Sequence, residues 1–301
     1  MKTLKEAEIM VKEALSVAPP PEKLISCKGL RGFRLFSDLG LYKSKKHCYN
    51  SDVMHHCNSK KTAFTLAEVL ITLGIIGVVA AMTMPSLIAN HKEKETVAKL
   101  KKVYSTLSNA YLLAKEKYGT PENWELTEYD SPEGADNALS KLAEFMNVAK
   151  YCGNAPGCYT DVDYRYLNGQ KYNYSVDNNT SYAKLILADG TIIAMNIREP
   201  DCKQDRGDSI VLKNVCGTFS VDINGPKPPN QIGRDRFGFI LSKYGIIPHG
   251  AQLETMFSFE TNCKDKSTHQ GFGCTAWVVF NENLDYMRCN DLDWKNKTKC
   301  K

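Results

Sequence analysis

The sequence lacks the short motifs that mark several large classes of enzyme. It contains no GxSxG nucleophile elbow, no HExxH zinc motif and no GxxxxGK[ST] phosphate loop. Its cysteines never form a CxxC pair, the spacing that is typical of zinc knuckles. Only two of the six histidines lie beyond residue 118. We therefore expect a protein that is not an enzyme.

Excess positive charge is also absent from most of the chain. The formal net charge is +5, but residues 1–63 hold 12 Lys and Arg against 6 Asp and Glu. Residues 64–301 hold 27 against 28. A surface that binds nucleic acid needs clustered cations opposite the phosphates. We therefore expect no nucleic-acid partner.

Cysteine is abundant, with 11 residues, of which three precede Phe64 and an even set of eight follows it. The spacings within this later set suit disulfide-closed loops, although the sequence does not fix the pairing. Disulfides persist only in an oxidising compartment, so the count favours export of this part of the chain. The eight candidates are Cys152, Cys158, Cys202, Cys216, Cys263, Cys274, Cys289 and Cys300.

An almost unbroken apolar run of 19 residues, Leu66–Met84, carries a single charge, on Glu68. As a helix it would span roughly 28 Å, close to the roughly 30 Å hydrocarbon core of a bilayer. It is longer than the apolar region of a cleaved secretory signal, and no AxA-like site follows it. The basic segment before it, which ends at Lys60 and Lys61, should stay cytoplasmic. We therefore expect a single-pass membrane protein whose later residues lie in the periplasm or on the cell surface.

The residues at the start of this run, KKTAFTLAEVL (60–70), resemble the signal of type IV prepilins and type II secretion pseudopilins. The resemblance implies cleavage by prepilin peptidase between Ala63 and Phe64, followed by methylation of Phe64. It also implies that Glu68 pairs with the terminal amine of a neighbouring subunit during assembly. A charge within a spanning helix costs about 2.5–3.5 kcal/mol, and such a partner would relieve its desolvation.

The chain departs from the family pattern at one position, since Ala63 stands where a glycine is usual. Pro85 lies where these helices commonly carry a proline that kinks them. Residues 1–63 would form the leader, which is long for this family. A start at Met54 would give the short basic leader MHHCNSKKTA.

Beyond Pro85, apolar residues recur at three- and four-residue spacing from Val97 to Ala114, and a stop signal follows at residues 119–121. We expect a helix over residues 64–118, transmembrane in its first part and amphipathic in its second. The remainder, 119–301, would be a globular pilin-like head. In the head we expect a short helix around residues 138–146, and strands at 183–188, 191–197, 209–212, 218–223, 237–241 and 275–280.

These elements predict an α+β fold. A long N-terminal helix would pack on a small antiparallel sheet, and disulfides would brace the loop-rich C-terminal end.

One loop of the head, within residues 221–237, is rich in side-chain oxygen and resembles a loop that is common in pseudopilin-like proteins. Asp222, Asn224, Asn230 and Asp235 could bind calcium, which prefers carboxylate and carbonyl oxygens. The same residues fit a connection built from Pro, Gly and Asx turns, because they do not make an EF-hand pattern. We expect no other cofactor.

The resemblance therefore implies a structural subunit of a type IV pilus or a type II secretion pseudopilus, which assembles with other such subunits. A second hypothesis keeps the anchor but gives the head a ligand, as in an adhesion or DNA-uptake module. A third is an anchored domain that never polymerises, in which Glu68 has no role. The aromatic residues that could stack on a ligand, or equally lie in the core, are Trp277, Trp294, Tyr159, Tyr164, Tyr166 and Tyr172.

Overall fold

The computed structural model describes residues 65–159, 162–265 and 270–300, all within one compact unit, Phe64–Lys301. The predicted leader 1–63, the possible start at Met54, and the predicted processing residues Ala63 and Phe64 lie outside the described residues.

The first described element is one long helix, α2 (Leu66–Tyr118), which begins at a capping box and ends at a glycine. The Thr65 hydroxyl accepts a hydrogen bond from the Glu68 amide, and the Glu68 carboxylate accepts one from the Thr65 amide. At the other end, Gly119 adopts φ of 79° and its amide donates to the carbonyl of Lys115. This left-handed φ favours glycine and stops the helix where the sequence predicts.

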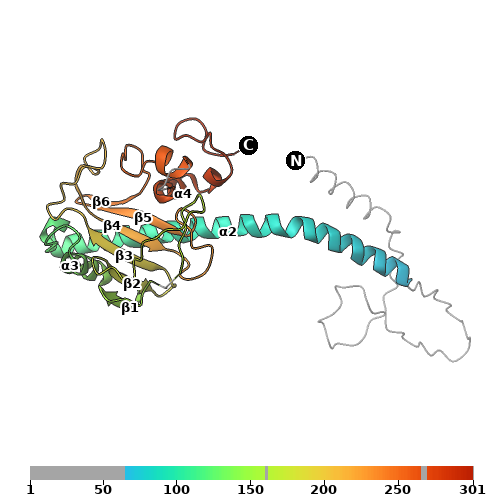
Figure 1. Ribbon diagram of the computed structural model, residues 1–301, viewed down its shortest axis with the longest axis horizontal. Coiled ribbons are helices and arrows are strands. Elements are labelled where there is room, and N and C mark those ends of the chain that lie inside the picture. The colour runs from blue at the N-terminus through green and yellow to red at the C-terminus, as the bar shows by residue number, and fades with distance from the viewer. Residues whose placement is uncertain (1–64, 160–161, 266–269, 301) are drawn as a thin grey trace, which may run out of the picture. The chain divides into compact units, whose positions relative to one another are not determined.

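The two halves of α2 have different environments. The apolar side chains from Leu66 to Ile88 are exposed, and in Figure 1 this part of the helix extends away from the sheet. The helix continues through Pro85, which lacks the amide that would donate to the carbonyl of Ala81. Whether this proline kinks the axis stays a prediction. The second half buries one stripe, made of Val97, Leu100, Val103, Leu107, Ala110, Tyr111 and Ala114.

Six strands form one antiparallel sheet in which each strand pairs with its neighbours in the chain, so the sheet is a meander (Figure 1). The predicted class, a long helix on a small antiparallel sheet, is confirmed. The strands are β1 (Val148–Gly153), β2 (Ala183–Leu187), β3 (Ile192–Ile197), β4 (Val215–Asp222), β5 (Arg236–Ser242) and β6 (Gly245–Pro248).

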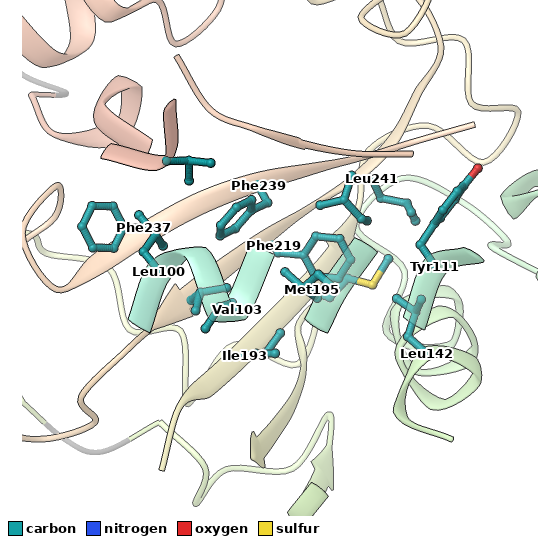
Figure 2. Close-up of a cluster of buried hydrophobic side chains, with 14 of the residues drawn as sticks. Leu100, Val103, Tyr111, Leu142, Ile193, Met195, Phe219, Phe237, Phe239 and Leu241 are labelled. Atoms are coloured by element: carbon teal, nitrogen blue, oxygen red, sulfur yellow. The ribbon is translucent and has the colours of Figure 1, made fainter. Parts of the chain in front are cut away.

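The main core lies between this sheet and two helices, α2 and α3 (Pro132–Ala143). Side chains alternate along a strand, so one face of each central strand supplies apolar groups to this core. Tyr104 of α2 stacks on Phe239 with ring centroids 6.0 Å apart. Figure 2 shows the residues that meet there, among them Leu100, Val103, Ile193, Met195, Phe219, Phe237 and Leu241.

The chain after β6 forms short helical elements around a second aromatic centre. Trp277 of α4 (Thr275–Asn281) is fully buried and stacks on Phe259 at 4.1 Å. Its indole N–H donates to Asn283 Oδ1 at 2.9 Å. The other short elements after β6 are the π-helical turn η2 (Glu260–Lys264), η3 (Phe272–Cys274) and η4 (Asp285–Met287), whereas η1 (Pro121–Asn123) follows α2.

Two predicted strands are wrong. Residues 275–280 belong to helix α4, because five consecutive residues at its start are buried and tertiary packing decides its conformation. Residues 209–212 form a turn in which the Ser209 carbonyl accepts hydrogen bonds from the amides of Leu212 and Lys213. The predicted helix around 138–146 is α3, which ends at Ala143. Strands β1 and β6 were not predicted.

The eight cysteines that follow Phe64 are joined in four disulfides, and each disulfide links one cysteine to the next cysteine along the chain. The chain separations are 6, 14, 11 and 11 residues, so each bridge closes a local loop of the head. The pairs are Cys152–Cys158, Cys202–Cys216, Cys263–Cys274 and Cys289–Cys300.

Candidate functional site

The exposed half of α2 is the first candidate site. Among the described residues, α2 is the one helix that is long and apolar enough to cross a membrane, and its most apolar stretch is not buried by the rest of the chain. So large an apolar surface needs either lipid or other apolar helices around it. This half of the helix therefore has the properties of a membrane anchor.

Glu68 lies in the first turn of this anchor. Its Oε2 atom accepts hydrogen bonds from the Thr65 amide at 2.8 Å and from the Thr65 hydroxyl at 2.9 Å. Within the described residues, Oε1 accepts no hydrogen bond and no cation pairs with the carboxylate. Within the described residues, the local capping box thus orients the carboxylate through only one of its two oxygens.

The loop between β4 and β5 contains the four predicted calcium ligands, and Asp222 is its first anchor. Its Oδ1 atom accepts hydrogen bonds from the amides of Asn224 at 3.0 Å and Gly225 at 2.8 Å, which makes an Asx turn. Its other oxygen accepts one from the hydroxyl of Tyr164. Burial raises the pKa of the Asp222 carboxyl to about 6, and the neighbouring Asp235 adds to this shift.

Asp235 anchors the other end of the loop. Its carboxylate accepts hydrogen bonds from the amides of Asn230 and Gln231, both at 2.6 Å. Burial raises its pKa as well. Two buried amide oxygens, Asn224 Oδ1 and Asn230 Oδ1, have no hydrogen-bond partner in the described structure. The oxygen donors are thus of the kind that calcium prefers, although both carboxylates also brace the loop through the protein's own donors.

No group of three or more His, Cys, Asp or Glu residues that could hold a metal ion occurs among the described residues. The candidate loop offers two carboxylates and two amide oxygens, so any ion there would depend on Asn224 and Asn230 as ligands.

Two family models match the chain, and their boundary falls within α2. Residues 58–84 match the prokaryotic N-terminal methylation motif. Residues 86–282 match a family of unknown function, DUF6613, over more than half of the chain. The chain belongs to this family. No curated protein and no solved structure matches it.

The methylation motif identifies the DUF6613 chain as a type IV pilin-like substrate of prepilin peptidase. The motif covers the predicted cleavage site and the apolar part of α2. The DUF6613 match covers the amphipathic part of α2, the whole sheet and α4. The Cys289–Cys300 disulfide lies outside the matched residues.

Most of the aromatic residues proposed from the sequence as ligand platforms lie in the core of the DUF6613 head. Trp277 is fully buried, and Tyr159 and Tyr164 are buried over the sheet. Trp294 is partly buried and contacts Trp277. Tyr166 and Tyr172 contact each other edge to face at 5.4 Å and line a cavity described below.

Sequence reasoning missed the polar side chains on the face of the sheet that points away from α2. Lys184 of β2 is fully buried, and its ammonium donates to the carbonyls of Asn154, Asp177 and Asn179. These bonds hold the β1–β2 connection over this outer face. Arg236 of β5 is likewise buried there. In the sequence, each of these residues is a charged residue at a strand position that faces away from the core. That pattern alone fits exposure to solvent as well as burial.

Proposed function

We propose that this protein is a structural subunit, a pilin or pseudopilin, of a type IV pilus or a type II secretion pseudopilus. The observation that carries the proposal is the methylation motif at 58–84, which leads directly into an exposed apolar helix. A pilin-like signal favours a structural subunit over an enzyme. The four disulfides of the head support a location outside the cytoplasm, where such bonds persist.

In this proposal the apolar half of α2 first holds the precursor in the membrane. Prepilin peptidase removes the leader before Phe64, and the subunit then leaves the lipid as its helix packs against the helices of other subunits. Repeated contacts that do not close on themselves give a helical filament. The amphipathic half of α2 attaches the head, so extraction of the helix carries the head with it.

Processing tests the proposal directly. We expect the protein recovered from membranes to begin at a methylated Phe64 when the host has prepilin peptidase, and to keep its leader when the host lacks it. Intact-mass spectrometry and N-terminal peptide sequencing measure the difference. The peptidase must recognise a small residue before the cut, so Ala63→Gly should preserve cleavage and Ala63→Leu should abolish most of it.

An intact leader in both hosts would contradict the proposal, provided that expression from Met1 and from Met54 gives the same result. In that case the chain would be an anchored head that does not enter a filament.

We further propose that the β4–β5 loop binds calcium when both carboxylates are ionised. The charge of Asp235 disfavours ionisation of the buried Asp222 carboxyl, and a divalent cation would relieve this repulsion. At neutral pH, above the raised pKa of Asp222, we expect saturable calcium binding by calorimetry with the full chain in nonionic detergent micelles. At a hundredfold excess over the dissociation constant, calcium should stabilise the fold by about 2.7 kcal/mol.

Variants of this loop distinguish a cation site from simple bracing. Asp235→Asn and Asn224→Ala should each lose calcium binding, whereas Asp201→Asn removes an exposed carboxylate elsewhere and should not. Absence of binding to the unmodified chain would show that the loop is held by its own hydrogen bonds alone.

A further inference from the structure

A cavity of about 330 Å³ lies against the outer face of the sheet, on the side away from α2. Thr218 and Ser220 of β4 and Gly238 of β5 form part of its lining. Gly238 is required there, since a Cβ atom would lie 2.3 Å from the ring of His249, which also lines the cavity. The close approach of ring and strand thus shapes this end of the cavity.

Arg236 is a buried charged residue of the lining. Its side chain is 3% exposed, and Nε donates to the Ser220 hydroxyl at 2.8 Å. Nη1 is buried without a hydrogen-bond partner, and no carboxylate of the described residues pairs with the guanidinium. Asp222 lies opposite Arg236 in the β4–β5 pairing, and its Oδ2 atom accepts a hydrogen bond from the Tyr164 hydroxyl. Among the described residues, Arg236 is therefore a buried cation that makes no ion pair.

Aromatic rings lie beside the Arg236 guanidinium. The guanidinium lies 4.8 Å from the ring centroids of both Tyr164 and Tyr172, and 5.6 Å from that of Tyr159. Such contacts favour a cation but supply no full negative charge. A buried charge that is neither paired nor fully hydrogen-bonded is costly, so the observed arrangement favours an anion that completes it.

A continuous series of ring contacts forms part of the cavity lining. Tyr182 contacts Tyr174, which contacts Tyr172, and Tyr172 in turn contacts Phe272. Phe272 stacks on Phe257 at 5.2 Å. These rings present flat apolar surface to whatever fills the cavity, which suits a ligand with a ring or hydrocarbon body.

The remaining polar groups of the lining reinforce a preference for an anion. Among the described residues, no Asp or Glu lines the cavity, while a second cation, Arg198, does. Arg198 is shared with Asp130, whose carboxylate lies 3.2 Å from Nη1. The hydroxyls of Tyr172 and Tyr182 make no hydrogen bond within the described structure and are available as donors. The cavity thus offers positive charge and hydrogen-bond donors, with apolar walls.

We propose that this cavity is a binding site for a small carboxylate that has a ring body, with the carboxylate on Arg236 and the ring between the tyrosines. A planar guanidinium matches a planar carboxylate in shape and charge. The volume lies at the lower end of the range for small-molecule pockets, which limits the ligand to about one ring and its carboxylate. This property of the head is independent of whether α2 enters a filament.

Two probes distinguish the kind of ring body. Benzoate carries an aromatic ring, and glucuronate carries a sugar ring. Benzamide and glucose are the matched molecules that lack the charge. We expect the full chain in nonionic detergent micelles to bind at least one of the two acids saturably in calorimetry, and to bind the matched neutral molecule roughly tenfold more weakly or worse.

Single substitutions test whether the acid binds in this cavity. Arg236→Gln should weaken binding of the acid by roughly tenfold or more, because the charged partner is lost. Arg206→Gln is the matched control, since Arg206 is also 3% exposed with an unpartnered Nη1 but does not line the cavity. It should leave binding unchanged, and it corrects for partition of the probe into micelles. Tyr172→Leu keeps the Arg236 charge but removes one of the rings beside it, and should weaken binding even if Arg236→Gln folds poorly.

Three results would overturn the proposal. The first is no saturable binding of either acid, and the second is equal binding of acid and neutral molecule. The third is equal loss of binding in the Arg206 and Arg236 variants, which would place the probe elsewhere.

Discussion

Replacing Glu68 with alanine should prevent the protein from entering filaments while leaving it in the membrane and its head folded. In the proposed filament the Glu68 carboxylate pairs with the terminal amine of a neighbouring subunit among apolar helices. Breaking a buried ion pair by removing one partner costs about 3–5 kcal/mol, because the other charge stays buried without compensation. This corresponds to a loss of incorporation of roughly a hundredfold or more. Quantitative immunoblots of sheared filaments against the membrane fraction measure it.

The local role of Glu68 must be separated from this role in assembly. Alanine also removes the capping box with Thr65 and so weakens the start of α2. Glu68→Gln keeps an oxygen that can accept from the Thr65 amide, as the capping box allows, but it carries no charge. We expect it to fail in assembly as completely as alanine does. Glu95→Ala removes an exposed carboxylate of the same helix, paired with Lys99, and should assemble normally.

Normal assembly of Glu68→Gln would show that Glu68 serves only to cap the helix. Normal assembly of Glu68→Ala would show that its charge has no part in the filament.

The sequence predicted the fold best where a local signal was sufficient. The apolar stripe of α2 and the stop at Gly119 are both local. Strand β1 was missed because it is an edge strand that exposes its central residues, Lys150 among them, and so has no alternating pattern. Strand β6 has only four residues and ends in Pro248. Strands with such weak local signals can be recognised only when the neighbouring strand is known.

The prediction of the site was limited in the same way. The anchor and Glu68 belong to one continuous segment, so the sequence could present them together. The cavity is instead lined by β4, by β5 and by aromatic side chains from connecting segments that are far apart in the chain. Arg236 becomes a buried cation only because the β1–β2 connection covers the outer face, and Lys184 holds that connection in place. No spacing within the sequence encodes this contact.

Residues 275–280 form part of helix α4 and not the predicted strand, and Trp277 of this helix is fully buried. We therefore expect Trp277→Ala to lower the free energy of unfolding of the head by about 3–5 kcal/mol, the range for truncating a buried large aromatic side chain. The variant would lose the stacking on Phe259 and the contact with Trp294, and Asn283 would lose its indole donor. For a domain of this size we expect a melting temperature lower by about 6–20 °C. Thermal unfolding of the full chain in micelles, followed by circular dichroism with the disulfides intact, measures it.

Phe280→Ala is the control that distinguishes helix from strand. In α4, Trp277 and Val278 are both buried, whereas Phe280 is 57% exposed and contacts only the edge of the Tyr104 ring among the aromatic side chains described. In a strand, alternation would place Phe280 on the same face as Val278 and bury both. The helix therefore predicts a loss of less than about 1 kcal/mol for Phe280→Ala, as for most exposed positions. An equal loss in the two variants would mean that the segment packs as a strand, and that Trp277 is not the centre of the C-terminal core.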